Sequence, residues 1–173
     1  SSGNVGIGTS TPTGIHTAAK VLEISGGDGG DLIIGNNVST NIGAGAHIGT
    51  LAFKNIDDTD SGAVPHYAGI RCEAANTSGS MDLRFYVGRN NLESDAPTML
   101  IDSSGRLLLG TTTEGESGAD DLTIATSATT GITIRSGTTS NGNIYFSDGT
   151  SGNAEFQGAV QYDHGNSDLY FRS

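Results

Sequence analysis

Cysteine, basic side chains and long apolar runs are all scarce in this chain of 173 residues. Because Cys72 is the sole cysteine, no disulfide can form within the chain, and stability cannot come from cross-links. Only 8 Lys and Arg stand against 19 Asp and Glu, and the net charge of −11 disfavours binding to nucleic acid or to anionic membrane surfaces. The longest apolar runs, such as 107–109, are far shorter than the roughly 18 residues of a membrane span, so membrane insertion is not expected.

Large apolar side chains are also few. The sequence has 11 Leu, 14 Ile, 6 Val and 5 Phe, which is close to the floor of roughly 20% below which charged chains tend toward disorder. Its 27 Gly, with abundant Thr, Ser and Asn, indicate many turns and small side chains. A single chain is therefore expected to have a marginal core, and association with further copies would supply the missing burial.

An internal repeat organises the sequence. The segment 1–9 recurs as 103–111, an offset of 102 residues, and keeps the Ser-Ser-Gly turn and the closing Gly-Thr. Apolar segments follow both copies in the same order, namely 22–24 and 122–124, 32–34 and 132–134, 51–53 and 144–146, and 82–85 and 168–171. The spacing shrinks along the second copy because its loops are shorter.

The repeat divides the chain into three parts. Residues 1–12 are expected to finish a preceding unit, 13–112 to form a complete unit of about 100 residues, and 113–173 to begin a further, truncated unit. The chain has no initiating Met and no basic start followed by an apolar run, so we expect a fragment of something longer. A tandem array of this kind serves length or multivalency more readily than a single active site.

Short alternating apolar runs, bounded by Gly, Asn, Ser and Asp, predict an all-β fold of antiparallel strands. The runs 69–74 and 81–87 each separate apolar from charged side chains, which predicts one buried face and one wet face. The apolar sets are Ile70, Cys72, Ala74 and Met81, Leu83, Phe85, Val87; the opposite sets are Arg71, Glu73 and Asp82, Arg84, Tyr86. On this apolar face Cys72 is expected to be a buried, inert thiol.

Turn chemistry adds detail to this fold. Asp-Ser-Ser-Gly at 102–105 predicts a hairpin between 99–101 and 107–109. The only helix candidate is 15–23, of one or two turns at most. A sandwich-like unit and an intertwined prism share the same local alternation, so both architectures stay open.

Two segments carry a resemblance to a known class of proteins. Ser-Gly-Asn-Val-Gly-Ile-Gly-Thr-Ser-Thr-Pro at 2–12 and Ile-Asp-Ser-Ser-Gly-Arg-Leu-Leu-Leu-Gly-Thr at 101–111 resemble a repeat of phage tail-fibre and tailspike proteins. In many of those, an endosialidase-type intramolecular chaperone lies downstream. The resemblance implies an elongated trimeric β structure on a virion, and it transfers no catalytic residue to this chain. Residues 106–109 depart from the usual Asn-Val-Gly-Ile.

Two acidic segments are candidate calcium sites. From Gly26 to Ile34 the sequence matches the calcium nonapeptide pattern, but that site needs tandem copies, so a glycine turn at 26–31 that enters a strand at 32–34 is favoured. Asp57, Asp58 and Asp60 lack the Gly and the terminal Glu of a twelve-residue calcium loop, which favours a solvated loop.

No catalytic, cofactor or metal residue is predicted. The histidines have no metal-binding spacing, although a single one could meet its copies on a threefold axis; they are His16, His47, His66 and His164. The nucleophile elbow and the phosphate-binding loop are both missing from the sequence.

The functional hypothesis is therefore structural: a non-enzymatic homotrimeric shaft or adhesive module of a fibre, located on a virion and in contact with other fibre proteins. One alternative is recognition of host-surface glycan by the polar loops 54–66 and 88–97. Another is cleavage of a polysaccharide by a pair of carboxylates close in space.

Overall fold

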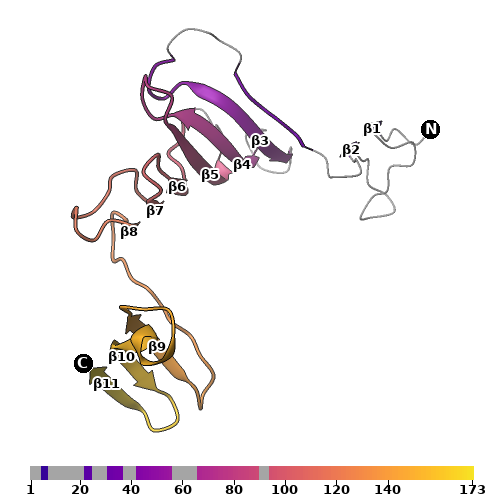
Figure 1. The fold of residues 1–173 in the computed structure, drawn as a ribbon. Coiled ribbons are helices and arrows are strands. Elements are labelled where there is room, and N and C mark those ends of the chain that lie inside the picture. Colours follow the sequence, from indigo (N-terminus) through magenta and orange to yellow (C-terminus); the bar gives the residue numbers. More distant parts are fainter. Residues whose placement is uncertain (1–4, 8–21, 25–30, 37–41, 56–65, 90–93) are drawn as a thin grey trace. The chain divides into compact units, whose positions relative to one another are not determined.

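A computed structural model describes residues 5–7, 22–24, 31–36, 42–55, 66–89 and 94–173 (Figure 1). Strands account for 43% of the structure and the described residues contain no α-helix, so the prediction of an all-β chain is confirmed. The chain divides into two compact units, Ser1–Thr126 and Ser127–Ser173. The repeat boundaries predicted from the sequence stay a prediction.

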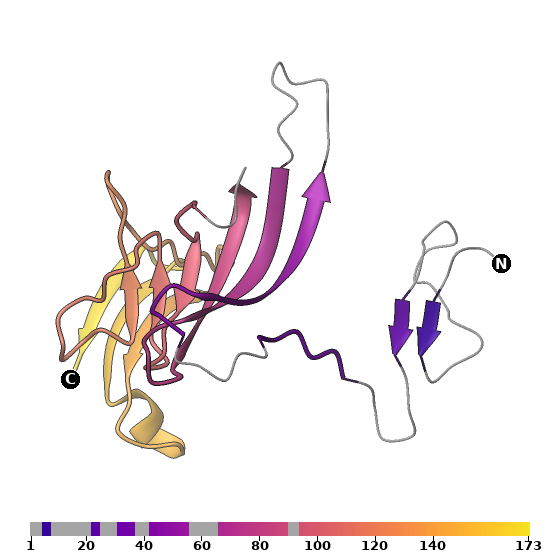
Figure 2. The ribbon, with the colours of Figure 1, turned by 90° about the horizontal axis from the view of Figure 1, so that it is seen from above.

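The larger unit contains a six-stranded sheet in the order β3-β4-β5-β6-β7-β8. Long antiparallel strands form its first half and three-residue strands its second half (Figure 2). The turn between β4 and β5 is fixed by Asn76, whose Oδ1 accepts a hydrogen bond from the Ser78 amide at 2.8 Å, and by Gly79 with φ of +88°. The strands are β3 (His47–Asn55), β4 (His66–Ala74), β5 (Met81–Arg89), β6 (Met99–Ile101), β7 (Leu107–Leu109) and β8 (Leu122–Ile124).

The hairpin predicted at residues 102–105 is confirmed, because β6 and β7 pair antiparallel across it. The Asp102 amide donates to the Arg106 carbonyl at 3.0 Å, and the Gly105 amide donates to the Asp102 carbonyl at 2.9 Å. Gly105 has φ of +84°, which glycine adopts without the steric penalty of a side chain.

Two strand pairings are parallel, although the alternation predicts only antiparallel ones. Strand β7 pairs with β8 in the register Leu107↔Leu122, and a separate pair, β1 (Val5–Ile7) with β2 (Leu22–Ile24), has the register Val5↔Leu22. Both pairings join the end of the recurring Gly-rich segment to the first apolar triplet after it. Parallel partners need a long connection, and here 12 and 14 residues separate the strands.

The smaller unit is a three-stranded antiparallel sheet in the order β11-β10-β9. Its elements are β9 (Asn141–Phe146), the 3-10 helix η1 (Gly152–Phe156), β10 (Gly158–Asp163) and β11 (Asp168–Arg172). Asp163 stabilises the turn between β10 and β11, since its Oδ1 accepts from the Gly165 amide at 2.8 Å and its Oδ2 from the Asn166 side chain at 2.9 Å.

The three strands β3–β4–β5 and the three strands β9–β10–β11 have matching registers. In the larger sheet one row joins Leu51, Ile70 and Phe85, and in the smaller sheet a row joins Ile144, Val160 and Phe171. The next row on the same face joins Gly49, Cys72 and Leu83, and it corresponds to Gly142, Tyr162 and Leu169.

Strands predicted at 32–34 and 132–134 are wrong: neither segment belongs to a strand, and both are exposed. Each lacks the ladder partner that a strand needs in the described structure. Each isoleucine that ends the segment nevertheless lies over a glycine of the first long strand. A Cβ at Gly49 would meet Ile34 Cγ2 at 2.8 Å, and one at Gly142 would meet Ile134 Cγ2 at 3.4 Å.

The helix candidate 15–23 falls largely outside the described residues. Its last two residues, Leu22 and Glu23, belong to β2 and are extended.

Candidate interaction surface

One face of the six-stranded sheet carries apolar side chains on every strand. Residues directly opposite each other on neighbouring strands project to the same side, so the register assigns each side chain to a face. The rows Leu51–Ile70–Phe85 and Phe85–Met99–Leu109–Ile124 run across the sheet on one side. This apolar face comprises Leu51, Phe53, Ile70, Cys72, Met81, Leu83, Phe85, Met99, Ile101, Leu107, Leu109, Leu122 and Ile124.

Much of the apolar face is open to solvent. The exposed fraction is 65% for Phe53, 54% for Met81 and 50% for Leu122, while Leu51 and Leu83 are also exposed. The exposed side chains belong to β3, β5 and β8. Half-buried apolar side chains of the same face, such as Ile70 on β4 and Met99 on β6, lie between them. Monomeric proteins rarely leave large continuous apolar patches in water, so this face is a candidate interaction surface.

The opposite face of the same sheet is the buried one, and it carries charges on β4 and β5 and the apolar side chains of Leu100 and Leu108 on β6 and β7. Arg71 is 5% exposed, Glu73 4% and Asp82 9%, and Tyr86 beside them is 2% exposed. The assignment of the wet face from the sequence is therefore wrong for the single chain. Alternation separates the two faces correctly, but which of them is covered depends on the rest of the fold.

The buried charges of this face form ion pairs. Glu73 lies between two guanidinium groups, with Oε1 3.0 Å from Arg71 Nε and Oε2 2.7 Å from Arg84 Nη1. Asp82 Oδ2 is 3.3 Å from Arg84 Nη2, and its Oδ1 accepts from the Ser103 amide at 3.0 Å. Buried charges are tolerated when they are paired and hydrogen-bonded in this way.

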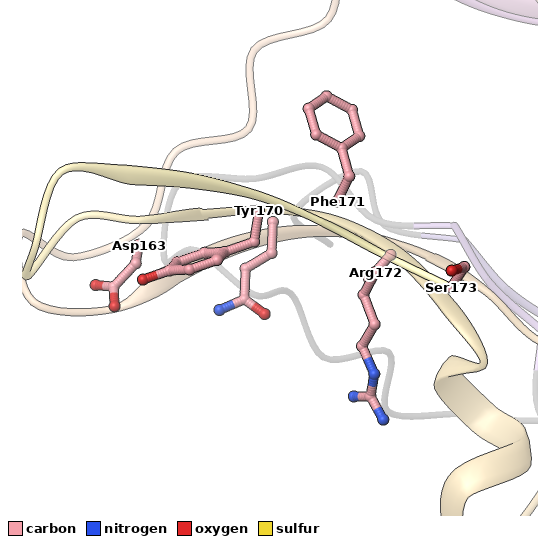
Figure 3. Close-up of a pocket in the computed structure, with 7 residues that line it drawn as sticks. Asp163, Tyr170, Phe171, Arg172 and Ser173 are labelled. Carbon is pink, nitrogen blue, oxygen red and sulfur yellow. The ribbon is translucent and has the colours of Figure 1, made fainter.

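The sheet of the smaller unit repeats this arrangement. Its register places six apolar side chains on one face, and Phe171 at 78% exposure and Phe146 at 61% are the most open. Figure 3 shows Phe171 on one side of β11, with Tyr170 and Arg172 on the other side. The small apolar face comprises Ile144, Phe146, Val160, Tyr162, Leu169 and Phe171.

The other side of the small sheet is polar and partly covered by η1. The rings of Tyr145 and Phe156 lie 6.0 Å apart, and the Arg172 guanidinium lies 4.9 Å from the Phe156 ring centre. A shallow pocket of about 640 Å³ lies here (Figure 3), lined by Ala159, Gln161, Asp163, Tyr170, Phe171, Arg172 and Ser173. The Tyr170 hydroxyl donates to Asp168 at 3.2 Å, which raises the pKa of Tyr170 and disfavours a phenolate base.

Arg106 links the β6–β7 hairpin to the connection before β8. Its Nε donates to Asp102 Oδ2 at 2.7 Å and its Nη1 to Asp120 Oδ2 at 2.8 Å. Burial of Asp102 opposes ionisation, yet the hydrogen bonds from the Arg106 backbone and side chain lower the pKa of Asp102. The side-chain hydrogen bonds to Asp102 and Asp120 raise the pKa of Arg106, which stays charged. The sequence pattern does not predict the bond between Arg106 and Asp120, because the two residues are 14 positions apart.

Several candidate calcium-binding and glycan-binding residues lie outside the described residues. They include Asp57, Asp58 and Asp60, most of the polar loop 54–66, residues 90–93 of the loop 88–97, and the segment from Gly26 to Gly30. Asp31 is described and exposed. The calcium and glycan hypotheses for these segments stay predictions.

The contacts of the single cysteine and of the described histidines are with one or two neighbouring side chains. Cys72 is half-buried with its Sγ 3.6 Å from Met81 Sδ, and burial together with Asp82 and Glu73 raises its pKa, which keeps the thiol protonated. His47 Nε2 is 2.7 Å from the Thr50 hydroxyl, and His164 packs edge-on against Tyr162. His66 is exposed, and His16 is outside the described residues.

Within the described part of the chain, no three His, Cys, Asp or Glu side chains gather as a metal site. No helix among the same residues is long and apolar enough to cross a bilayer. No family model matches the chain, and no curated protein matches it. The exposed apolar faces of the two sheets are therefore the features that point to a function.

Proposed function

We propose that this chain is a non-enzymatic structural segment of a phage-type fibre or similar surface appendage on a virion. Tandem β units form an elongated homotrimer in which the apolar sheet faces of three copies pack together. The exposed apolar face, opposite a covered and ion-paired polar face, is the observation that carries this proposal.

The magnitude of the apolar exposure favours association. Full burial of a Leu or Phe side chain stabilises by about 1.5–3 kcal/mol, so ten half-exposed side chains represent on the order of 10 kcal/mol per chain. That is comparable to the whole stability of an ordinary domain. The same face of a second chain can pack against this apolar face, because it is equally apolar.

Corresponding registers support the tandem repeat. Leu51, Ile70 and Phe85 are matched by Ile144, Val160 and Phe171, while the parallel pairing of β1 with β2 is matched by that of β7 with β8. The contacts of Ile34 with Gly49 and of Ile134 with Gly142 add a third correspondence.

A closed trimer fits sheets that have one apolar face each. Three such sheets around an axis cover all three apolar faces, while the opposite face of the larger sheet stays covered within each chain. The resemblance of 2–12 and 101–111 to phage fibre repeats supports three copies rather than two. The assembly would act mechanically, as a shaft, and by multivalency, since three weak contacts raise avidity.

The alternatives have no described feature in their favour. Glycan recognition is predicted for the loops 54–66 and 88–97, and the structure describes neither loop completely. Polysaccharide cleavage needs an acidic cleft, and the described pocket beside Asp163 is shallow, with Asp163 hydrogen-bonded in a turn.

Native mass spectrometry at low micromolar concentration tests the proposal. We expect particles of three chains, each of 17.6 kDa. Phe171→Ser should raise the concentration at half-assembly at least about tenfold, because every trimer loses three buried rings. Tyr170→Ser, on the other side of β11, is the matched control and should leave assembly unchanged. A folded monomer, a dimer, or equal effects of the two variants would contradict the proposal.

A further inference from the structure

The outer edge of β11 corresponds to an edge that is occupied in the larger sheet. Strand β5 has β4 on one side and β6 on the other, while β11 has only β10 and ends its sheet within the described structure. By the matching registers, Leu83, Arg84 and Phe85 correspond to Leu169, Tyr170 and Phe171.

The partner of the β5 edge is a short hairpin. Leu83, Arg84 and Phe85 pair with Ile101, Leu100 and Met99, and the Thr98 amide donates to the Phe85 carbonyl at 2.8 Å. Strand β7 then extends the sheet. An edge strand presents unpaired backbone groups that readily accept a further strand.

We propose that the outer edge of β11 is an acceptor site for a β-hairpin with the chemistry of β6–β7. The occupant is a Met-Leu-Ile strand, an Asp-Ser-Ser-Gly turn and a Leu-Leu-Leu strand, supplied by another repeat of the array. It pairs antiparallel with 169–171 in the register of β6 on β5. This inference rests on the tandem repeat proposed above.

Side-chain chemistry favours this occupant over an arbitrary strand. The counterparts of Met99 and Ile101 would fall beside Phe171 and Leu169, and so would extend the small apolar face by two side chains. The counterpart of Leu100 would fall beside Tyr170, whose phenol can pack against it. The bound hairpin would also cover an edge that otherwise invites unspecific pairing.

A cross-linking experiment tests the edge and its register. The full chain carrying Cys72→Ser and Tyr170→Cys is mixed with a peptide of residues 94–110 carrying Leu100→Cys, and disulfide formation is measured by mass. Opposite residues of an antiparallel pair have Cβ atoms about 4.5–5.5 Å apart, close to disulfide geometry. We expect at least about fivefold more product than with a Met99→Cys peptide, whose thiol projects to the other face. Equal yields from the two peptides would overturn the proposal.

Hydrogen exchange provides a second readout on the unmodified chain. The unmodified peptide should slow exchange of the amides in 168–172, and a Leu100→Pro peptide should not, because proline removes a ladder donor. Absence of protection at saturating peptide would also overturn the edge site. Particle mass separates the two claims: a trimer that ignores the peptide contradicts only the acceptor site, and a monomer that captures the peptide contradicts only the trimer.

Discussion

At the scale of single residues, the glycine of the Gly-Thr motif at 110–111 is required by the backbone conformation and by a close contact. Gly110 is the glycine near the end of the second copy of the repeated segment, and its φ is +72°. A Cβ at this residue would clash with the Ala125 carbonyl oxygen. The Ala125 amide in turn donates to the Leu109 carbonyl at 3.0 Å, so the chain after β8 passes close to Gly110. A side chain at this position would push the parallel β7–β8 pairing apart.

Gly110→Ala should lower the free energy of unfolding by about 1–3 kcal/mol, because it combines a left-handed backbone with a steric clash. Chemical denaturation followed by tyrosine fluorescence gives the measurement. Gly131→Ala is the matched control, since nothing lies within 4 Å of its Cβ position and its φ is not positive. Equal stability losses in the two variants would show that the close approach at Gly110 is unimportant.

Arg106 gives the hairpin a dependence on pH. The lowered pKa of Asp102 means that its contribution is present above the ordinary value of 3.8 and is lost as the pH falls through the lower folded value. Arg106→Met removes the side-chain bonds, so the loss of stability between pH 7 and pH 3 should shrink. Unfolding curves at both pH values, with exposed Arg135→Met as a control, measure this difference. An unchanged acid response in Arg106→Met would refute the assignment.

At the scale of elements, alternation predicts the two faces of a strand but not which face the chain covers. In β4 and β5 the like charges of Glu73 and Asp82 face each other directly, as do those of Arg71 and Arg84. The attractive contacts run diagonally, as between Glu73 and Arg84. The polar face is therefore held by its own ion pairs, and the apolar face is left for another surface.

Glu73→Ala should destabilise the fold by about 3–5 kcal/mol, because it removes the carboxylate shared by two arginines that are largely buried. Glu114→Ala is a suitable control, since that side chain is 48% exposed and 4.0 Å from its partner. Thermal or urea denaturation of both variants distinguishes them. A loss below about 1 kcal/mol for Glu73→Ala would mean that the network contributes no more than a surface pair.

The sequence predicts those elements whose signals are local. The 102–105 turn and the alternation of 81–87 depend on neighbouring residues, and both are found in the structure. Contacts made over long separations could not be predicted, namely the parallel β7–β8 pairing and the Arg106–Asp120 bond. The segments 32–34 and 132–134 have strand-like composition but no ladder partner, so composition alone gives the wrong answer there.

At the scale of the whole molecule, the proposed trimer would couple folding to association. Two sheets with corresponding registers each leave an apolar face in water, and the chain has too few large apolar residues to cover both. The proposed core shared among copies would resolve this deficit. Repetition of the unit along the chain would then extend the shared core into a fibre.

The dependence of unfolding on protein concentration tests this shared core most directly. When folding requires association, mass action shifts the equilibrium toward the folded state as concentration rises. We therefore expect the urea midpoint, followed by tyrosine fluorescence, to increase clearly over a hundredfold rise in chain concentration. A cooperative transition with the same midpoint at every concentration would mean that each chain completes its own core, and would contradict the account.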